Sequence, residues 1–530
     1  MLNCINTIER VGIMSTADRK RLPIGIQTFR EIRENNHYYV DKTALALQLI
    51  QSGKHYFLSR PRRFGKSLFL DTLKEIFEGN SSLFEDLAIH SHWDWSVHYP
   101  VIRFSFGSKE YSQGSGLEST LNTQLSHLEQ TFGIRKQFED ASGRFADLLV
   151  QLHKTTGLPV VVLIDEYDKP MLDALEHPEI AKANRDFLRG FYGVIKDYDA
   201  HIRFSLLTGV SKFSKVSLFS GLNNLNDISL DKRYSSLCGY TDKDIDQTFA
   251  AELDGLDRQA IRDWYNGYHW RGEGVYNPFD ILQLFDKREF RNYWFETGTP
   301  TFLVDLLFKR QVPSLQLDNM LSSSAILSSF DIEEIATEAL LFQTGYLTIK
   351  HEENLGGQYF YTLGYPNREV YQSLNENLLS VLVQDKTRQT QQSSQLYRRL
   401  LVNDFDGLRQ LFHSFYASIP HHWYTHNDIQ NFEGYYASVF YSYFAALGLT
   451  VIVEDCTNHG RLDMTVKFNQ QIYLFEFKVV EIAPEGKALQ QLKDKAYADK
   501  YRGLGQPIHL IGVEFSKESR NIVGFEVVSG

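Results

Sequence analysis

The stretch that decides the fold of the N-terminal half is Arg60-Pro61-Arg62-Arg63-Phe64-Gly65-Lys66-Ser67. It comes one residue after the mostly apolar run His55–Leu58 and opens the amphipathic segment Ser67–Phe77, so it lies between an expected strand and an expected helix. The first N–H groups of a helix are free, and its N-terminus is the positive end of the helix dipole, so phosphate oxygens bind there. A Gly-Lys-Ser tripeptide in this context predicts a phosphate-binding loop.

Two residues of this loop have expected roles in nucleotide binding. Lys66 is expected to reach the β- and γ-phosphates, and the Ser67 hydroxyl to ligate Mg²⁺. The other members of the expected nucleotide-binding set are Gly65 and the arginines Arg60, Arg62 and Arg63. Arg60 stands where the general pattern has its first glycine, which lets the backbone turn tightly. A chance Gly-Lys-Ser is the alternative interpretation, and the arginines equally suit a partner surface.

An acidic motif further along supports the phosphate site. Five aliphatic residues, Val160–Ile164, precede Asp165 and Glu166, which describes a buried strand that ends in two carboxylates. Asp165 is expected to join the Mg²⁺ shell, and Glu166 to orient or activate the attacking water. A solvated strand end is the alternative. A third expected strand ends at Thr208, a candidate sensor of the γ-phosphate that a capped turn explains equally well.

Composition places the chain among soluble globular proteins of several domains. Its 530 residues suggest about three domains. The three cysteines, Cys4, Cys238 and Cys456, are too few and too scattered for a disulfide framework or a zinc site, and they fit a reducing cytoplasm. No apolar run has the length of a membrane span, so we expect no membrane partner. The net charge of −11 argues against a generally basic surface but leaves a local basic groove open.

The order of the patterns predicts a domain plan. Short apolar runs alternate with helical patterns from Leu22 to about Tyr240, which predicts an α/β domain with a parallel sheet. The pattern is mostly helical from Thr241 to about Lys386, and the polar stretch Lys386–Gln395 predicts a linker or exposed loop. We therefore expect a leader at 1–21, an α/β domain at 22–240, a mostly helical segment at 241–386 and a C-terminal domain at 387–530.

The C-terminal domain holds ionisable residues on two adjacent expected strands. The run Arg461–Phe468 alternates strictly, with Asp463 on its polar face. After a short turn, Ile472–Val480 is apolar enough to be a central strand, yet Glu476 and Lys478 interrupt it and point to the same face. Burying either charge is costly unless it is paired or ligates a metal. Two carboxylates and a lysine in one place predict metal-dependent phosphodiester hydrolysis.

The flanking segments add two more candidates. Residues 428–447 predict a helix in which Glu433 lies on or beside an apolar stripe, so Glu433 is a third candidate metal ligand with Asp463 and Glu476. Residues 487–501 predict a helix whose glutamines and lysines suit contacts to a nucleic-acid backbone. The alternative is a glutamate–lysine pair at a sheet surface, with Asp463 capping a turn.

Together these motifs resemble a bacterial family with an AAA-ATPase-like N-terminal domain and a C-terminal domain of the PD-(D/E)XK nuclease superfamily. The resemblance covers nearly the whole chain from Leu22 onward. The similar stretches are LPIG at 22–25, YVDK at 39–42, RPRRFGKS at 60–67, IDEYDKP at 164–170, WYNGY at 264–268, VYNP at 275–278, GRLD at 460–463, EFK at 476–478 and ALQQL at 488–492.

The resemblance implies a fold, cofactors and site residues. It implies an N-terminal P-loop fold (a parallel sheet flanked by helices), a helical middle segment and a C-terminal restriction-endonuclease-like α/β domain. ATP and Mg²⁺ are the implied cofactors, with Mn²⁺ as an alternative ion at the nuclease site. The matching nuclease positions are Glu433, Asp463, Glu476 and Lys478, with Gln491 as an accessory residue. Leu462 stands where the superfamily has proline, which leaves cleavage itself open.

The function we expect is that of an ATPase coupled to a metal-dependent DNA endonuclease, in defence or mobile-element biology. One alternative is an ATP-controlled switch that holds DNA or a protein without cutting. Another is a static module that binds nucleotide tightly and hardly turns it over. The sequence leaves open the choice between DNA and RNA and whether the chain forms an oligomer.

Overall fold

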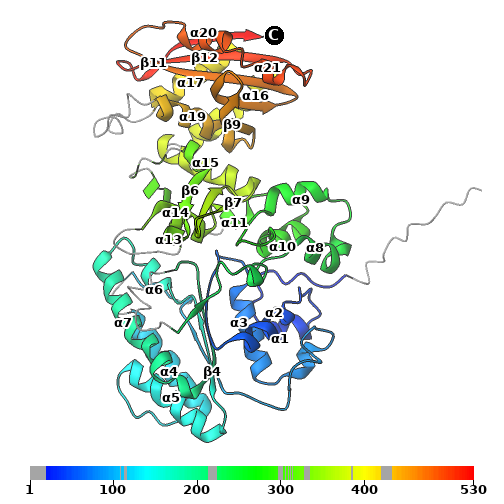
Figure 1. Cartoon of the computed structure of the whole chain (residues 1–530), viewed down its shortest axis with the longest axis vertical. Coiled ribbons are helices and arrows are strands. Elements are labelled where there is room, and N and C mark those ends of the chain that lie inside the picture. The colour runs from blue at the N-terminus through cyan, green and yellow to red at the C-terminus, as the bar shows by residue number, and fades with distance from the viewer. Residues whose placement is uncertain are drawn as a thin grey trace, which may run out of the picture. The chain divides into compact units, whose positions relative to one another are not determined.

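The computed structural model describes residues 19–529 apart from 108, 113–115, 213–223, 297–302, 305, 308–309, 311, 313, 328–334, 384–385 and 419–432 (Figure 1). The chain divides into two compact units, one of residues 1–290 with 328–335 and one of residues 291–327 with 336–530. Most of the predicted leader, 1–21, lies outside the described residues. The division at 290/291 falls inside the segment predicted at 241–386, so that segment contributes to both units.

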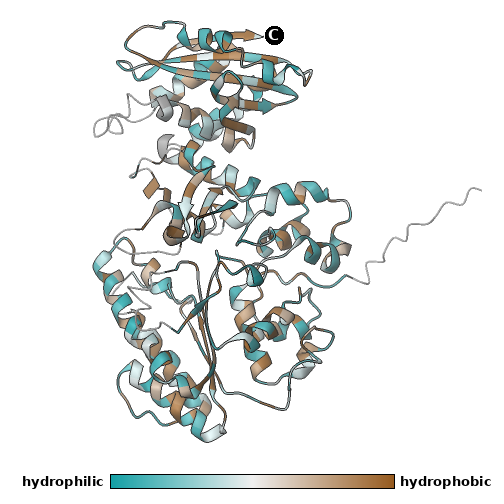
Figure 2. Ribbon diagram, viewed as in Figure 1, coloured by the Kyte–Doolittle hydropathy of each residue, from teal (hydrophilic) through white to brown (hydrophobic). Residues whose placement is uncertain are grey.

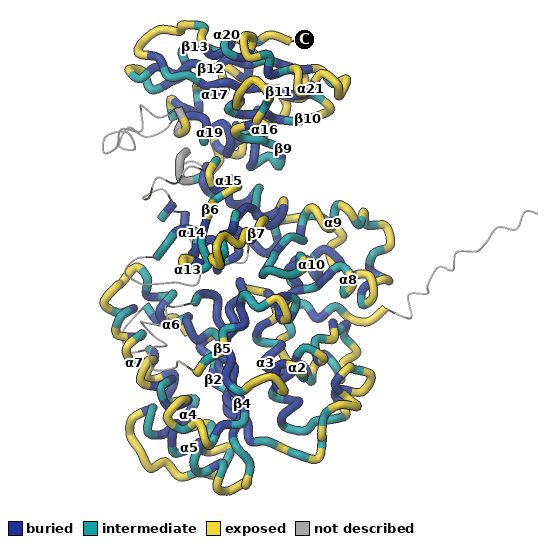
Figure 3. Tube along the Cα trace, in the orientation of Figure 1, coloured by how far each residue is buried: buried dark blue, intermediate teal, exposed yellow. Residues whose placement is uncertain are grey.

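A five-stranded sheet forms the centre of the first unit. Its strands are β1 (His55–Ser59), β2 (Val101–Ser105), β3 (Val160–Asp165), β4 (Ile202–Gly209) and β5 (Asn226–Asp227). All neighbouring strands are parallel, in the order β2-β3-β4-β1-β5. Every residue of β1 and β3 is buried, as a parallel sheet covered on both faces requires. Figure 3 shows this sheet in dark blue between helices with exposed yellow faces.

The first unit has helices on both faces of this sheet (Figure 1). The helices of the first unit are α1 (Phe29–Glu34), α2 (Thr43–Ser52), α3 (Lys66–Phe77), α4 (Gly116–Phe132), α5 (Ala141–Thr156), α6 (Lys169–Leu172), α7 (Pro178–Asp197), α8 (Asp242–Thr248), α9 (Arg258–Tyr265) and α10 (Pro278–Lys287). Phe77 of α3 packs on Phe204 of β4. Helices α5 and α7 instead pack on Phe104 of β2. The strand register puts Phe104 and Phe204 on opposite faces, which confirms the predicted α/β architecture.

The second unit begins with short helices around a three-stranded sheet. These elements are α11 (Tyr293–Glu296), β6 (Met320–Ser323), α13 (Ser324–Leu327), α14 (Thr337–Thr344), β7 (Thr348–Leu355), β8 (Gln358–Gly364) and α15 (Arg368–Val383). The strands are antiparallel in the order β6-β8-β7. Helix α14 is buried along most of its length, so it offers little surface to a ligand. The middle segment is therefore mostly helical, as predicted, but it also contains a sheet.

A second five-stranded sheet forms the C-terminal domain. Its elements are α16 (Lys386–Leu401), α17 (Phe405–Ser418), α19 (Glu433–Ala446), β9 (Thr450–Thr457), β10 (Gly460–Phe468), β11 (Gln471–Val480), α20 (Lys487–Asp494), α21 (Asp499–Arg502), β12 (Ile508–Ser516) and β13 (Asn521–Ser529). The order is β13-β12-β11-β10-β9, and only β11 and β12 are parallel. This mixed α/β sheet confirms the predicted fold class.

Two apolar cores cover the two faces of the C-terminal sheet. On one face, aromatic residues of α17 and α19 pack on β11 and β12; the rings of Phe412 and Phe440 stack with centroids 3.8 Å apart. On the other face, Leu489 and Leu492 of α20 pack with Leu474 of β11. Figure 2 shows apolar residues, in brown, along the strands of this sheet. A side chain on β11 therefore faces either α19 or α20.

The structure corrects the prediction of a linker at Lys386–Gln395. This stretch is the first part of helix α16. Gln389 and Gln392 are buried at helical spacing from Leu396 and Leu400, so the two glutamines extend an apolar stripe. The Gln389 amide donates to the Glu376 carbonyl at 2.9 Å, which satisfies the buried polar group. The polar composition wrongly indicated an exposed segment, because both glutamines have hydrogen-bond partners inside the fold.

The structure also corrects the prediction of one helix at 487–501. Helix α20 ends at Asp494, and a separate short helix, α21, begins at Asp499. Between them Ala496 has a φ of 46°, in the left-handed region that breaks a helix. Among the described residues, no helix combines the length and the apolar character that crossing a bilayer requires.

We predict that Leu396→Ala lowers the free energy of unfolding by about 2–5 kcal/mol, because it leaves a cavity under α16. Gln395→Ala, at the exposed neighbouring position, should change it by less than about 0.5 kcal/mol. Urea unfolding of the full chain, followed by circular dichroism, measures both. Equal losses in the two variants would show that α16 is not held by this apolar stripe.

Candidate active sites

The phosphate loop connects β1 to α3 and turns at two left-handed residues. Arg63 has a φ of 69° and Gly65 a φ of 89°. The position of a Cβ on Gly65 meets no atom within 4 Å, so the glycine is required by its backbone conformation and not by crowding. Helix α3 starts at the next residue, Lys66, without a side-chain cap. The loop thus turns tightly although Arg60 stands in place of the first glycine.

Lys66 is buried at the start of α3. Its ammonium group donates to the carbonyl oxygens of Arg60 and Pro61, at 2.9 Å each. Burial lowers the pKa of Lys66, while the nearby carboxylates of Asp165 and Glu166 act in the opposite direction. Carbonyl oxygens compensate a buried cation only in part. Lys66 is therefore a cation poised for a ligand with negative charge.

Arg60 is part of the loop's structural support. Its guanidinium group donates to the carbonyl oxygens of Ser59, Ser229 and Tyr234 and stacks on the Trp270 ring, 4.2 Å from the centroid. Burial lowers its pKa to about 10. This side chain is thus engaged by the fold. Arg62 and Arg63, which the sequence also assigned to nucleotide binding, are both exposed.

The carboxyl ends of β1, β3 and β4 bring the other expected nucleotide residues to one edge of the sheet. The register aligns Ser59 with Gly209 at this edge, and β3 ends there at Asp165. The Thr208 hydroxyl donates to the Asp165 carboxylate at 2.9 Å. Ser67 lies half-buried in the first turn of α3. Strand geometry therefore gathers Ser67, Asp165 and Thr208 around the start of α3.

Glu166 follows β3 in a left-handed conformation, with a φ of 52°. Left-handed glutamate is uncommon, and such strained backbone is held in place by the surrounding fold. Burial raises the pKa of Glu166, the charge of Lys66 opposes this, and Asp165 raises it further. A carboxyl group held in this way is suited to accept a proton from water.

Asp168 is a structural acid that the sequence interpretation left unassigned. Its carboxylate accepts hydrogen bonds from the backbone N–H groups of Val210 and Ser211, at 2.9 and 2.6 Å, and from the Ser211 hydroxyl at 2.6 Å. It thereby ties the end of β3 to the loop after β4. Its place in the IDEYDKP stretch, three residues after Asp165, was the available signal.

Aromatic residues of the segment 264–278 pack against the phosphate loop. The ring of Phe64 contacts both Tyr268 and Trp270, with centroids 4.8 and 5.2 Å away. The Arg63 guanidinium lies 4.9 Å above the Phe279 ring. These contacts give the 241–290 region a role in the first unit that composition did not reveal.

In the C-terminal domain, β10 and β11 carry the expected carboxylates. The Asp463 carboxylate accepts the Phe477 backbone N–H at 2.8 Å, so it lies across β11 beside Glu476. The alternation predicted for β10 is wrong at Leu462, which packs with the α20-side core, whereas Met464 packs on the α19 side. The pairing of β10 with β11 ends at Met464, so the strand is irregular at Asp463.

Glu476 is fully buried at 0% exposure. Burial and the charge of Asp463 raise its pKa to about 7, against the opposing effect of Lys478. One carboxylate oxygen, Oε1, accepts from the Lys478 ammonium at 3.3 Å and from the Gln491 amide. The other, Oε2, is buried without a hydrogen-bond partner. The structure thus brings Glu476, Lys478 and Gln491 together with Asp463.

The donor set fits a divalent cation held by oxygen ligands. A buried carboxylate oxygen without a partner is costly, and a cation would satisfy it. Among the described side chains, no group of three or more His, Cys, Asp and Glu residues is arranged to hold a metal. Glu433 begins α19, but its side chain lies outside the described part of the chain, so its role as a third ligand stays a prediction.

Two residues of β12 hold α20 against this site. The Glu514 carboxylate accepts the backbone N–H groups of Glu485, Gly486 and Ala488, which satisfies the free donors at the start of α20. A Cβ on Gly512 would lie 2.3 Å from the Leu489 backbone nitrogen. Only glycine permits this close approach, which sets Gln491 within reach of Glu476.

Tyr497 is a site residue that sequence reasoning missed. It is buried, and its hydroxyl donates to the Arg461 carbonyl at 3.1 Å. Burial raises its pKa, and the charge of Glu476 adds to this effect. No sequence signal marked this tyrosine, because it lies between two short helices and not on the predicted continuous one.

Comparisons with known proteins match the two domains that hold these sites. A family model described as "Predicted AAA-ATPase" matches residues 23–219, and one described as "PD-(D/E)XK nuclease superfamily" matches residues 431–525. The chain is 61% identical over 512 residues to a protein of Azotobacter chroococcum mcd 1 described as "Uncharacterized protein in vnfD 5'region". The match covers 96% of this chain and 99% of that protein. These findings confirm the resemblance predicted from the sequence motifs.

We predict that Gly512→Ala lowers the free energy of unfolding by about 1–3 kcal/mol, because the added methyl group pushes on the α20 backbone. Gly503→Ala is the matched control, since a Cβ there meets no atom within 4 Å and its φ of −66° suits alanine. Thermal unfolding of both variants tests this. If Gly512→Ala were as stable as Gly503→Ala, the close approach would not position α20.

Proposed function

Because the chain belongs to a family that combines a predicted AAA-ATPase domain with a C-terminal PD-(D/E)XK nuclease-superfamily domain, we propose that it is an ATP-controlled, metal-dependent DNA endonuclease. The buried, unpartnered oxygen of Glu476 beside Asp463 carries the proposal for the nuclease. The buried ammonium of Lys66 near Asp165 carries it for the ATPase. We place the protein in the cytoplasm, in defence or mobile-element biology.

The ATPase proposal assigns each residue one task. Lys66 exchanges its two carbonyl partners for phosphate oxygens, whose negative charge compensates the buried cation better. Ser67 and Asp165 would hold a Mg²⁺ ion, which would supply charge neutralisation for the phosphates. Thr208 keeps the Asp165 carboxylate in place, and Glu166 orients the attacking water and accepts its proton.

The nuclease proposal uses the same logic. Asp463 and Glu476 would hold a Mg²⁺ or Mn²⁺ ion, with Glu433 as a further ligand. A bound ion would supply polarisation of the phosphate and a lowered pKa of bound water. Lys478 lies within hydrogen-bond distance of Glu476 and is placed to stabilise developing negative charge. Gln491 fixes the orientation of the Glu476 carboxylate through its amide.

A second candidate function is a switch that binds DNA or a protein without cutting. Two observations favour it: Leu462 stands before Asp463, and the described side chains supply two carboxylates at the site and not three. Both functions share the ATPase proposal, so the cleavage assay below decides between them.

We predict that Lys66→Ala weakens ATP binding about 10–100-fold, since it removes charge-assisted hydrogen bonds to phosphate. Glu166→Gln should leave binding nearly unchanged and slow hydrolysis about 10²–10⁴-fold, because it removes the general base. Calorimetric titration measures the first effect and phosphate release the second. Unchanged ATP affinity in Lys66→Ala would contradict the phosphate site.

We also predict that Asp463→Asn and Glu476→Gln each reduce metal-dependent cleavage of plasmid and single-stranded DNA by more than about 100-fold. Even outer partners of metal ligands are worth roughly 10–100-fold. Glu454→Gln is the control, because that acid is exposed on the adjacent strand and paired with Arg461. ATP should change the wild-type rate but not that of Lys66→Ala.

Two outcomes would contradict the endonuclease. Full cleavage by both site variants would mean that the activity lies elsewhere. No cleavage by a wild-type chain that binds ATP and DNA in Mg²⁺ and in Mn²⁺ would favour the non-cleaving switch.

A further inference from the structure

Arg103, on β2, lies between two buried carboxylates of the first unit. Its Nη1 atom donates to the Asp71 carboxylate of α3 at 2.7 Å, and its Nη2 atom forms an ion pair with Asp165 at 3.7 Å. The strand register pairs Ser105 with Asp165, so Arg103 lies two residues before the edge where the nucleotide residues gather. The proposed ATP chemistry gives Arg103 no task, although it contacts the acid expected to hold Mg²⁺.

The two contacts of Arg103 are unequal. The contact with Asp71 is a short hydrogen-bonded ion pair, whereas the 3.7 Å between Arg103 and Asp165 exceeds hydrogen-bond distance. The Arg103 side chain is 28% exposed, whereas those of Asp71 and Asp165 are 9% and 4% exposed. One guanidinium group therefore compensates two buried negative charges, tightly at Asp71 and loosely at Asp165.

Asp71 has a second partner that fixes its position. Its carboxylate accepts the backbone N–H of Phe29 at 2.7 Å. This N–H belongs to the first turn of α1, where backbone donors have no partner within their own helix. Asp71 thereby caps α1 from α3. Asp71 therefore stays in place, and Arg103 is the member of the set that can move.

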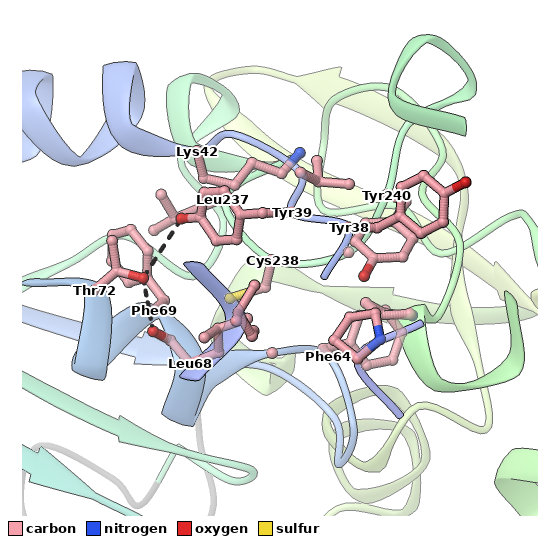
Figure 4. Close-up of a pocket in the computed structure, with 16 residues that line it drawn as sticks. Tyr38, Tyr39, Lys42, Phe64, Leu68, Phe69, Thr72, Leu237, Cys238 and Tyr240 are labelled. Carbon is pink, nitrogen blue, oxygen red and sulfur yellow. Dashed lines mark hydrogen bonds between the residues drawn. The ribbon is translucent and has the colours of Figure 1, made fainter. Parts of the chain in front are cut away.

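The segment of α3 around Asp71 is anchored by further contacts. The Thr72 hydroxyl donates to the Leu68 carbonyl at 2.9 Å, and its oxygen lies 3.4 Å from the Tyr39 hydroxyl (Figure 4). The ring of Phe29 packs on that of Tyr39, with centroids 5.0 Å apart. These contacts hold α1 and the YVDK stretch on α3, so Asp71 cannot follow a shift of Arg103.

The Asp165 carboxylate has different partners for its two oxygens. Oδ1 accepts from the Thr208 hydroxyl at 2.9 Å, and Oδ2 faces Arg103. The charges of Lys66 and Glu166 also act at this place, with opposite signs. Carboxylate and hydroxyl oxygens are the ligands that Mg²⁺ prefers, so the donor set fits this ion. A cation that binds at Oδ2 meets the positive charge of Arg103.

We propose that Arg103 is an internal counter-cation that sets how strongly the nucleotide site binds Mg²⁺. Arg103 compensates Asp165 when no metal is bound, and it shifts wholly to Asp71 when the carboxylate takes a metal. It is a positioning residue, since it acts on the metal through Asp165. This inference rests on the proposed ATPase function and deepens it by naming the group with which the metal competes.

Removing Arg103 has two opposing effects on metal binding. It takes a positive charge away from Asp165, which raises the affinity for a cation. It also removes a neighbour that orients the carboxylate, but a contact of 3.7 Å without a hydrogen bond orients weakly, and Thr208 still holds the other oxygen. The effect of the charge is therefore the larger one, and we expect tighter metal binding without Arg103.

The test measures the factor by which Mg²⁺ strengthens the binding of ADP to the full chain, by calorimetric titration in saturating Mg²⁺ and in EDTA. ADP leaves no γ-phosphate to transfer, so the factor reports on the metal site and not on turnover. Arg103→Gln should increase this factor about 3–10-fold, because the metal no longer competes with a cation. Asp71→Asn should decrease it about 3–10-fold, because Arg103 loses its tight partner and moves onto Asp165.

The opposite signs distinguish this role from a structural one. Both substitutions break the same ion pair, so a purely structural role would shift the factor in one direction or not at all. Glu75→Gln is the matched control, because Glu75 lies one turn further along α3, is buried and pairs with Arg30 at 2.8 Å. It should leave the factor unchanged, and the double variant Arg103→Gln/Asp71→Asn should behave as Arg103→Gln does.

Thermal unfolding shows whether each variant is folded. If Arg103→Gln does not unfold cooperatively, Arg103→Lys takes its place. A single ammonium group cannot contact both acids at once, so this variant should also increase the factor, by less than the full loss of charge would. A factor in Arg103→Lys at or below that of the wild type would overturn the proposal.

The outcomes separate failure of this inference from failure of the ATPase proposal. Asp165→Asn should remove most of the effect of Mg²⁺ on ADP binding. If it does, and Arg103→Gln and Asp71→Asn do not shift the factor in opposite directions, Arg103 has a structural role only. If Asp165→Asn keeps the wild-type factor, or if the wild type does not bind ADP, the nucleotide site itself is wrong, and the role of Arg103 falls with it.

Discussion

Burying an ionisable group without a full set of opposite charges and hydrogen bonds costs free energy, and both candidate sites depend on this constraint. Lys66 is a buried cation with two carbonyl partners, and Glu476 is a buried carboxylate with one oxygen unpartnered. In each unit, the free energy gained by burying apolar residues in the core offsets this cost. Under the proposed function, each site takes a ligand of the missing charge: phosphate at Lys66 and a cation at Glu476.

The two sheets place these groups by different routes. Parallel strands of the first unit end at one edge, so residues distant in sequence, such as Asp165 and Thr208, meet around the start of α3. In the C-terminal sheet the antiparallel pair β10 and β11 brings Asp463 beside Glu476, and α20 completes the site from above one face. Rigid elements carry the groups in both cases, which limits how far each can move.

The sequence predicted the parts that follow from local pattern. A Gly-Lys-Ser at a strand–helix junction and two acids after an aliphatic run specify their own surroundings, and strand alternation put Glu476 and Lys478 on one face. Other features depend on tertiary partners that no local pattern encodes. Arg60 supports the loop because carbonyls of distant segments and Trp270 receive it. Gln389 and Gln392 became buried helix residues for the same reason, and Tyr497 reaches the site only because the helix around it breaks.

The most direct test of this account is scanning calorimetry of the full chain with ATP and Mg²⁺, with Mn²⁺ alone, and with neither. A ligand that binds only the folded state raises the unfolding temperature by mass action. The account predicts that Mn²⁺ alone stabilises the chain and that nucleotide with Mg²⁺ stabilises it further. The further shift should be lost in Lys66→Ala, and the shift with Mn²⁺ alone in Glu476→Gln. Unfolding temperatures that neither ligand changes would contradict the claim that the two buried charges await opposite partners.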